Sequence, residues 1–221
     1  MKYIITAFIS LTILSACNTG TTTGNSLKKS QSTEQTDGYK AGDIVFQQGS
    51  SAQCVAVKAA TGSEWSHCGI ILPHSGKLMV LEAIQPVQWE EIGAWKKRGD
   101  GNVMEVKRLI ADSLLTDDVV QRMVNYGSHF VGEDYDIFFN WDDTEWYCSE
   151  LVWKIYYNAL RIEVGVRKPL KEYNLNEPIV KQIMDARYGS KPPLDMMMIS
   201  PVAIYESDLL TDVVAAERVK F

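Results

Sequence analysis

The stretch WYCSELVWKIYY, residues 146–157, decides the fold because it predicts an amphipathic helix that begins at a cysteine. Glu150 and Lys154 have the i,i+4 spacing of a stabilising ion pair, and they lie on the side of that helix away from Cys148. An upstream N-cap places Cys148 in the first turn, and the candidates are Asp142, Asp143 and Thr144. Apolar or aromatic residues share the face of the cysteine at helical spacing: Leu151, Val152, Ile155, Tyr156 and Ala159.

A cysteine at the start of a helix has two properties that suit thiol catalysis. The thiolate is the nucleophile, and the positive end of the helix dipole favours this ionised form. The backbone N–H groups of the first turn have no partner within the helix and can stabilise a developing oxyanion. Cys148 is therefore a candidate nucleophile. The alternative is a small buried hydrophobic residue on the core face, which is the commoner role of a cysteine.

A cysteine nucleophile needs a base, and the sequence contains three histidines. His67 lies in the strand-like run SHCGIIL, whereas His74 falls in a predicted turn and His129 near a helix end. The alternation of a strand points the side chains of His67 and Cys68 to opposite faces. His67 is therefore the candidate base, and Cys68 is only a weak rival nucleophile.

An imidazole that acts as a base is usually oriented by a third polar group. Glu82 is the one carboxylate in the apolar run KLMVLEAI, which follows the histidine run after a turn. An acid on an apolar face costs roughly several kcal/mol of desolvation unless it has a partner, and a neighbouring histidine supplies one. The alternative is that Glu82 points to solvent. Three other acids look more exposed and are weaker candidates: Glu64, Glu90 and Glu91.

The order of the predicted elements indicates the α+β class. Short β-like runs separated by turn signals come first, at 43–47, 67–72, 77–84 and 102–109. Helical patterns follow at 116–130, 148–160 and 178–188. Strands grouped together and flanked by helices predict an antiparallel sheet. The last thirty residues give no clear pattern.

The N-terminus predicts export. A lysine precedes the apolar run YIITAFISLTILSA, which suits a signal peptide and is short for a membrane-spanning helix. The run ends in LSAC, which resembles a bacterial lipobox and implies cleavage before Cys17 and lipid attachment to it. Alternatives are an ordinary signal peptide or an N-terminal membrane helix. We expect a lipid-anchored protein of the bacterial cell envelope, in the outer membrane if the source has one.

Composition sets the domain boundaries and the class of partner. Residues after the cysteine are rich in Ser, Thr, Gly, Asn and Gln, which predicts a flexible spacer. The expected organisation is therefore a signal peptide at 1–16, a lipidated Cys17 with a linker at 17–39, and one catalytic domain at 40–221. The net charge is −6 and no long run of Lys or Arg occurs, which excludes nucleic acid as a partner. The sequence does not indicate the oligomeric state.

A zinc site is an alternative use of the cysteines. The mature domain keeps three besides Cys17, and an odd number in an exported protein leaves at least one thiol free or paired between chains. A zinc ion could in principle be bound by the set Cys54, His67, Cys68 and Cys148. Adjacent strand residues seldom face the same ion, which weighs against this set. No Cys-x-x-Cys, His-Glu-x-x-His, Walker loop or Gly-x-Ser-x-Gly motif is present.

Five motifs together resemble a known family. In chain order they are GDIVFQQ (42–48), SHCGII (66–71), VLEA (80–83), GEDYD (132–136) and YCSELVWKIY (147–156). They resemble the permuted papain-like amidases of the YiiX type, relatives of the NlpC-type cell-wall cysteine peptidases in which the histidine strand precedes the cysteine helix. The resemblance implies a circularly permuted papain-like fold, with an antiparallel sheet or small barrel packed against helices.

The resemblance also implies roles for individual residues. It implies Cys148 as nucleophile, His67 as base and Glu82 as the group that orients the base, with no metal or organic cofactor. Tyr135 matches a tyrosine that lines the substrate cleft, although a buried core tyrosine is an equal alternative. Gln53 stands where relatives often have a polar residue near the site. Cys68 departs from the pattern, since an aliphatic residue is usual there.

Three functions follow from this resemblance. The first is a thiol hydrolase that cleaves amide bonds of a cell-envelope peptide or an N-acyl amide through an acyl-enzyme. The second is a lipid acyl hydrolase or acyltransferase, in which the six tryptophans line an acyl cleft. The third is a binding module without catalysis that retains the fold.

Overall fold

The computed structural model describes residues 38–213. The predicted signal peptide at 1–16, the lipidated Cys17 and the linker as far as residue 37 lie outside the described residues. Among the residues that are described, no helix is both long and apolar enough to cross a membrane.

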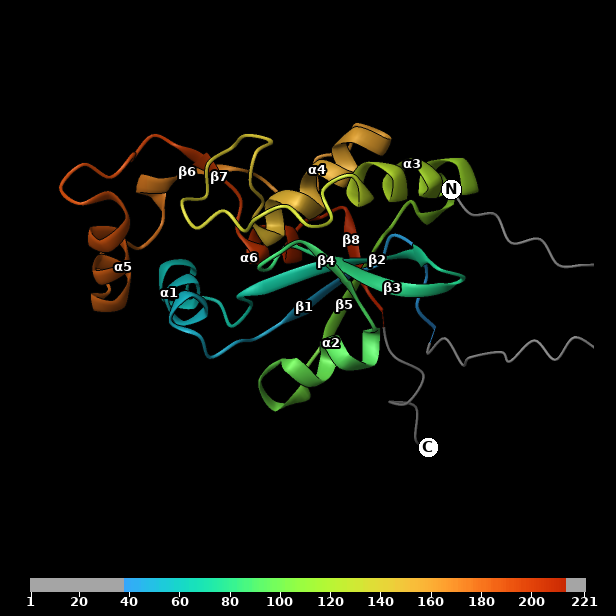
Figure 1. Ribbon diagram of the computed structural model, residues 1–221, viewed down its shortest axis with the longest axis horizontal. Coiled ribbons are helices and arrows are strands. Elements are labelled where there is room, and N and C mark those ends of the chain that lie inside the picture. Colours follow the sequence, from blue (N-terminus) through green and yellow to red (C-terminus); the bar gives the residue numbers. More distant parts are fainter. Residues whose placement is uncertain (1–37, 214–221) are drawn as a thin grey trace, which may run out of the picture. The chain divides into compact units, whose positions relative to one another are not determined.

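Six antiparallel strands form the main sheet, in the spatial order β4-β3-β2-β1-β5-β8 (Figure 1). The strands are β1 (Ile44–Gln47), β2 (His67–His74), β3 (Lys77–Glu82), β4 (Gln88–Glu90), β5 (Glu105–Leu109) and β8 (Leu210–Asp212). Two short strands form a second antiparallel sheet, β6 (Lys168–Pro169) and β7 (Met197–Met198). The predicted α+β class with an antiparallel sheet is confirmed.

The described helices are α1 (Ala52–Thr61), α2 (Ile92–Arg98), α3 (Asp117–Ser128), α4 (Cys148–Leu160), α5 (Pro178–Tyr188) and α6 (Pro201–Tyr205). Three 3₁₀ turns join them, at Asp100–Asn102, Asp112–Leu114 and Leu170–Glu172. The strand and helix patterns of the sequence predict β1, β2, β3, β5, α3, α4 and α5 to within a few residues. They do not predict the other elements, which are α1, α2, α6, β4, β6, β7 and β8.

The two faces of the main sheet bury two separate cores, as the alternation of strand side chains requires. Helices α3 and α4 lie over one face and α2 over the other (Figure 1). In β2, Cys68 and Ile70 belong to the larger core with α4, whereas Ile71 belongs to the smaller core with Trp95 of α2. The strand that carries the candidate base therefore has packed layers on both sides.

Helix α4 is buried almost all round, because the sheet, α3 and α6 all pack against it. The predicted pair of Glu150 and Lys154 is present at 2.8 Å, but both side chains are buried instead of facing solvent. The predicted N-caps at 142–144 are wrong. Tyr147 is the N-cap, and its backbone N–H donates to the Glu150 carboxylate at 3.5 Å.

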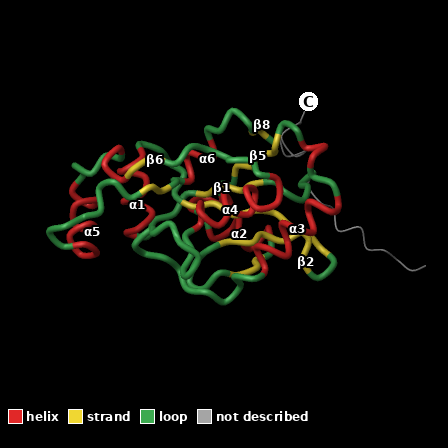
Figure 2. Tube along the Cα trace, turned by 90° about the horizontal axis from the view of Figure 1, so that it is seen from above, coloured by secondary structure: helices red, strands yellow, loops and turns green. Residues whose placement is uncertain are grey.

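Helices α1 and α5 lie together at one end of the described domain in both views (Figures 1 and 2). They run in opposite directions. The start of α1 meets the end of α5 through a hydrogen bond from Arg187 to Gln53. The end of α1 meets the segment before α5, where the Asn174 N–H donates to the Ala60 carbonyl at 2.9 Å.

Candidate active site

Cys148 is the first residue of α4 and is almost completely buried. The Leu151 N–H is the first to bond back to the start of the helix, at 3.1 Å from the Tyr147 carbonyl. The N–H groups of residues 148–150 therefore precede the regular bonding of the helix. The thiol lies beside these donors at the positive end of the helix dipole, as the sequence predicts.

Strands β2 and β3 bring His67 and Glu82 together. His67 Nε2 lies 2.6 Å from Glu82 Oε2, and the imidazole is also within hydrogen-bonding reach of the Cys148 sulfur. Since Nε2 of His67 faces the carboxylate, Nδ1 is the imidazole nitrogen available to hydrogen-bond with the Cys148 sulfur. Gly69 leaves room for this arrangement, because a Cβ at that position would lie 2.5 Å from Val80 Cγ1 and 3.4 Å from Glu82 Cβ.

Three further side chains hold the Glu82 carboxylate, and sequence reasoning missed all of them. Trp95 Nε1 donates to Oε2 at 2.7 Å, and Arg98 Nη2 donates to Oε1 at 2.6 Å. Gln88 Nε2 lies 3.5 Å from Oε1. Trp95 also stacks on the His67 ring, with centroids 6.0 Å apart. The carboxylate is therefore buried but fully partnered, which fixes its direction toward the imidazole.

The contacts of the site lower the pKa of Glu82 and raise the pKa of His67. Burial raises the pKa of Glu82, but hydrogen bonds and charge from His67 and Arg98 outweigh it and lower the pKa to about 2. Burial lowers the pKa of His67, but the neighbouring Cys148 thiolate and Glu82 carboxylate outweigh it and raise the pKa to about 10. Both groups are therefore ionised at neutral pH while Cys148 is a thiolate.

Cys68 takes part in the site, because its thiol hydrogen-bonds to Cys148, although strand alternation predicts that it points away from the neighbouring His67. Burial raises the pKa of the Cys68 thiol, so this thiol stays protonated. Its hydrogen bond to Cys148 is the largest of the causes that lower the pKa of Cys148, and the His67 imidazolium lowers it further. Cys68 thus acts as a hydrogen-bond donor to a thiolate. It is not positioned as a second nucleophile.

Tyr135 and Gln53 lie next to Cys148, where the resemblance implies a substrate cleft. Gln53 Nε2 donates to the Tyr135 hydroxyl at 3.2 Å, and Arg187 of α5 donates to the Gln53 carbonyl oxygen. Burial raises the pKa of Tyr135 well above its usual value, and the Cys148 thiolate raises it further. Sequence reasoning missed Arg187, although its i+7 spacing from Val180 places both on one face of α5.

A pocket opens beside Cys148, with about 790 Å³ of space that protein atoms do not fill, part of it open to solvent. It is lined by α1 and α5, by the start of α4 and by side chains within residues 196–201. Ser149 Oγ donates to the Ile199 carbonyl at 2.8 Å, which ties that region to α4. None of the six tryptophans lines this pocket.

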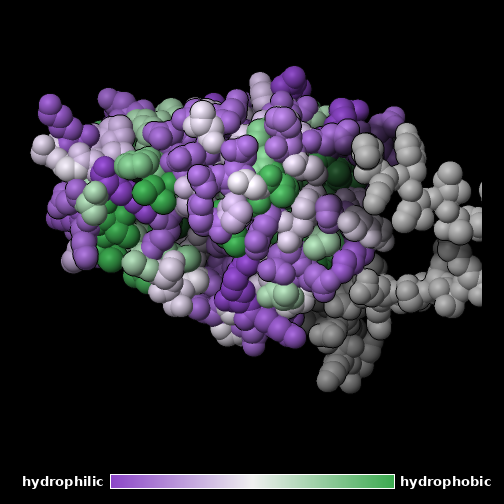
Figure 3. Space-filling model, viewed as in Figure 1, coloured by the Kyte–Doolittle hydropathy of each residue, from purple (hydrophilic) through white to green (hydrophobic). Residues whose placement is uncertain are grey.

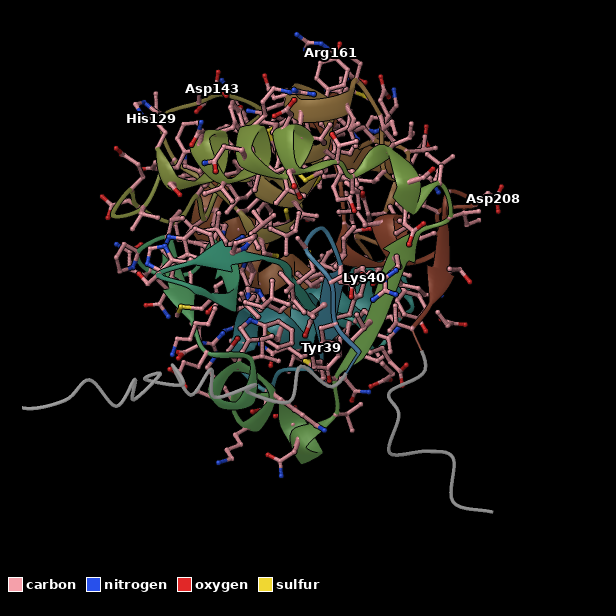
Figure 4. The ribbon with its side chains drawn as sticks, turned by 90° about the vertical axis from the view of Figure 1, so that its right-hand side faces the viewer. Tyr39, Lys40, His129, Asp143, Arg161 and Asp208 are labelled. Carbon is pink, nitrogen blue, oxygen red and sulfur yellow. The ribbon has the colours of Figure 1, made fainter. Side chains whose placement is uncertain are left out.

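The remaining candidates lie apart from this site. His129 caps the end of α3 and points outward (Figure 4). His74 is the last residue of β2, where its ring stacks on Trp89 with centroids 4.5 Å apart. Within residues 38–213, no group of three or more His, Cys, Asp or Glu side chains has a geometry that could hold a metal ion.

A histidine strand that precedes a cysteine helix, in an α+β fold, defines the permuted papain-like class. A family model described as "Permuted papain-like amidase enzyme, YaeF/YiiX, C92 family" matches residues 38–214. The chain belongs to this family.

Two relatives agree with the assignment. The uncharacterised protein YiiX of Escherichia coli strain K12 is 35% identical over 174 residues, which cover 79% of this chain and 85% of that protein. A crystal structure of YiiX from Escherichia coli O157:H7, described as a metalloprotein, has a TM-score of 0.75 and 35% identity. The match covers 80% of this chain and 97% of that one.

Proposed function

We propose that the protein is a thiol hydrolase that cleaves amide bonds through an acyl-enzyme on Cys148, with His67 as acid and base and Glu82 as the residue that positions His67. The amidase assignment of the family supports this reaction class. The observation that carries the proposal is the hydrogen-bonded series from Glu82 through His67 to Cys148. The substrate is an amide of the cell envelope, either a peptide or an N-acyl amide.

The first half of the reaction forms a thioester. The Cys148 thiolate attacks the amide carbonyl carbon, and the carbonyl oxygen takes the negative charge beside the N–H groups at the start of α4. His67 gives its proton to the amide nitrogen, and the carbon–nitrogen bond breaks to release an amine. Glu82 stays ionised and stabilises the imidazolium before this transfer.

The second half releases the acid. His67, now neutral, accepts a proton from water as the water oxygen attacks the thioester carbon. The carbon–sulfur bond breaks and returns the thiolate, and His67 is protonated again. The related crystal structure is described as that of a metalloprotein, but the described donor side chains of this chain do not form a metal-holding group.

The same proposal includes the location of the enzyme. The lipobox-like LSAC at 14–17 supports a lipid anchor on Cys17, which would hold the catalytic domain near substrates of the bacterial cell envelope. Metabolic labelling with a fatty-acid probe tests this directly: the full chain should be labelled and a Cys17→Ser variant should not.

A thiol-directed acyl probe tests the reaction. The full-length chain is treated with the probe and then with peptidoglycan fragments and simple N-acyl amides, beside Cys148→Ala and the matched control Cys54→Ala. We expect labelling and hydrolysis in the wild type and in the control, and a loss of at least about a thousandfold in Cys148→Ala. Unlabelled Cys148 in a folded protein would contradict the proposal and favour a binding module.

A further inference from the structure

We propose that Cys68 and Cys148 are a redox pair, in which hydrogen peroxide oxidises Cys148 and Cys68 then joins it in a reversible disulfide. This inference goes beyond the proposed hydrolysis, because the oxidation needs no amide substrate. Its support is the contact between the two side chains and the difference in their access to solvent.

The two thiols come from elements that pack directly against each other. Cys68 is the second residue of β2, and Cys148 is the first residue of α4. Both side chains belong to the larger core, where β2 and α4 are in contact. The Cys68 thiol hydrogen-bonds to the Cys148 sulfur. Since a disulfide forms only between cysteines that already lie close, this pair meets the first requirement without a movement of either element.

Packing alone does not require a sulfur at position 68. The side chain of Cys68 is completely buried among apolar neighbours, where a cysteine behaves as a small hydrophobic residue. An aliphatic residue, which is usual at this position in the family that the sequence resembles, would fill the same space. What the thiol adds is a hydrogen bond to Cys148 and the capacity to be oxidised with it.

The two thiols differ in access and in charge. Cys148 lines the pocket, part of which is open to solvent, whereas Cys68 does not line it and has no exposed surface. The contacts of Cys148 hold its pKa well below the usual value, and burial raises the pKa of Cys68. Peroxide reacts with thiolates rather than thiols. The oxidant therefore attacks Cys148, and Cys68 reacts only afterwards, with a neighbouring sulfur instead of a substrate.

The surroundings of Cys148 favour a small uncharged oxidant. The pocket is lined by α1 and α5, and Figure 3 shows hydrophobic residues gathered on the surface at the end of the domain where these helices lie. A charged molecule loses hydration in such surroundings, which costs free energy. Hydrogen peroxide is neutral and small, whereas glutathione disulfide is large and charged.

The reaction balances with one peroxide for each disulfide. The Cys148 thiolate attacks one peroxide oxygen, and the oxygen–oxygen bond breaks. Cys148 becomes a sulfenic acid, and the departing hydroxide takes the proton of the His67 imidazolium to form water. The Cys68 sulfur then attacks the Cys148 sulfur, and the sulfur–oxygen bond breaks. The Cys68 proton leaves with that hydroxide as a second water, so two thiol groups lose two electrons and the peroxide gains them.

Peptide mapping of the full-length wild type tests the pair directly. The chain is treated with hydrogen peroxide, alkylated with iodoacetamide and digested with trypsin without reductant. Trypsin separates the described cysteines, because Lys58 stands between Cys54 and Cys68, and Lys77 between Cys68 and Cys148. We expect a cross-linked peptide that contains Cys68 and Cys148, together with a fall of at least about tenfold in alkylation of Cys148, and dithiothreitol should reverse both. Peroxide treatment that yields no such cross-link would overturn the proposal.

Two alanine substitutions form a matched pair for the role of Cys68. Cys54 is the control thiol, since it is half-buried and its sulfur faces Gly49, where an added Cβ would lie 2.6 Å from it. Without Cys68, oxidation of Cys148 should continue to the sulfinic acid, which dithiothreitol does not reduce. We expect alkylation recovered after dithiothreitol to be at least about fivefold lower in Cys68→Ala than in the wild type or Cys54→Ala. Equal recovery in all three proteins, or a cross-link that contains Cys54, would contradict the assignment.

These measurements separate failure of this inference from failure of the proposed function, because mass and alkylation report on the thiols without turnover. Cleavage of amides by a chain that forms no disulfide would overturn the redox pair while the hydrolase stands. A Cys68–Cys148 disulfide in a chain that cleaves no amide would refute the hydrolase and retain the redox pair.

Discussion

The two sides of Cys148 differ in almost every physical property. On one side, His67 and Glu82 form an ionised pair that Arg98 completes, and all of these groups have partners at hydrogen-bonding distance. On the other side, the pocket between α1 and α5 is mostly apolar, and among the described lining residues Arg187 is the one charged side chain besides the Cys148 thiolate. The contrast indicates that one side is suited to moving a proton and the other to contacting apolar groups of a ligand.

Each side is supported in a different way. The charged side is rigid because a buried carboxylate that lost one partner would bear a large desolvation cost. The apolar side leaves side chains half-exposed, so its contacts remain available to a ligand. Substitutions on the charged side should therefore change rates and pH profiles, while those on the apolar side should change the preference for the substrate.

The largest expected effect comes from removing the centre of the charged side with His67→Ala. We expect amide hydrolysis to fall by roughly 10² to 10⁴-fold, since both proton transfers lose their carrier. The pKa of Cys148 should rise, because the imidazolium that lowers it is gone. The pH dependence of iodoacetamide alkylation measures this pKa. As the pH falls toward neutral, the alkylation rate should stay constant in the wild type and decrease in His67→Ala.

The control for this substitution is His129→Ala, which changes an exposed histidine at the end of α3. Its alkylation profile should match that of the wild type. Superimposable profiles for His67→Ala and the wild type would remove His67 from the role of base.

Glu82→Gln keeps the shape of the charged side and removes its negative charge. We expect kcat to fall on the order of tenfold to a hundredfold, since each 1.36 kcal/mol of lost stabilisation is a factor of ten. The lowered pKa of Glu82, about 2 against 4.5, stabilises the fold above pH 4.5, and this contribution is lost as the pH falls toward 2. The melting temperature of Glu82→Gln should therefore fall less than that of the wild type between pH 5 and pH 2.

Glu64→Gln is the matched control, because the Glu64 side chain is 71% exposed. Its melting temperature between pH 5 and pH 2 should follow the wild-type curve. A Glu82→Gln curve that also follows the wild type would show that the carboxyl does not titrate as its contacts require.

Tyr135→Phe probes the boundary between the two sides. The substitution removes the hydroxyl that accepts a hydrogen bond from Gln53, and it keeps the ring. We expect kcat/KM to fall about fivefold, the equivalent of one hydrogen bond of about 1 kcal/mol, with more of the change in KM than in kcat. A loss confined to kcat would instead place the hydroxyl in the chemical step.

The smallest expected effect is that of Cys68→Ala, which removes the thiol donor behind the nucleophile. We expect a loss of about threefold in kcat, because Cys68 makes and breaks no bond in the hydrolysis, and a rise in the pKa of Cys148, because the hydrogen bond that lowers this pKa most is gone. The measurement is the same alkylation profile, with Cys54→Ala as the control. A profile that does not move at all would show that Cys68 only fills space.

Local rules let the sequence determine much of the fold and the candidate site. The 3.6-residue period predicted α4 over 148–160, as the structure has it, although the predicted N-caps were wrong. Strand alternation separated His67 from Cys68, and the desolvation cost of an acid on an apolar strand singled out Glu82. The limits of α4 and the burial of Glu82 beside His67 agree with these inferences, because spacing within one element carries them. Cys68 is the exception, since its thiol also reaches Cys148. The catalytic roles of Cys148, His67 and Glu82 stay predictions.

Only the tertiary structure decided the groups that surround those residues. Arg98 reaches Glu82 across 16 positions and Arg187 reaches Gln53 across 134, through long side chains whose direction no local period encodes. The cap at Tyr147 and the open faces of α1 and α5 likewise depend on which elements pack together. Periodicity says which face of an element is apolar, but what that face meets is set by the packing of distant segments.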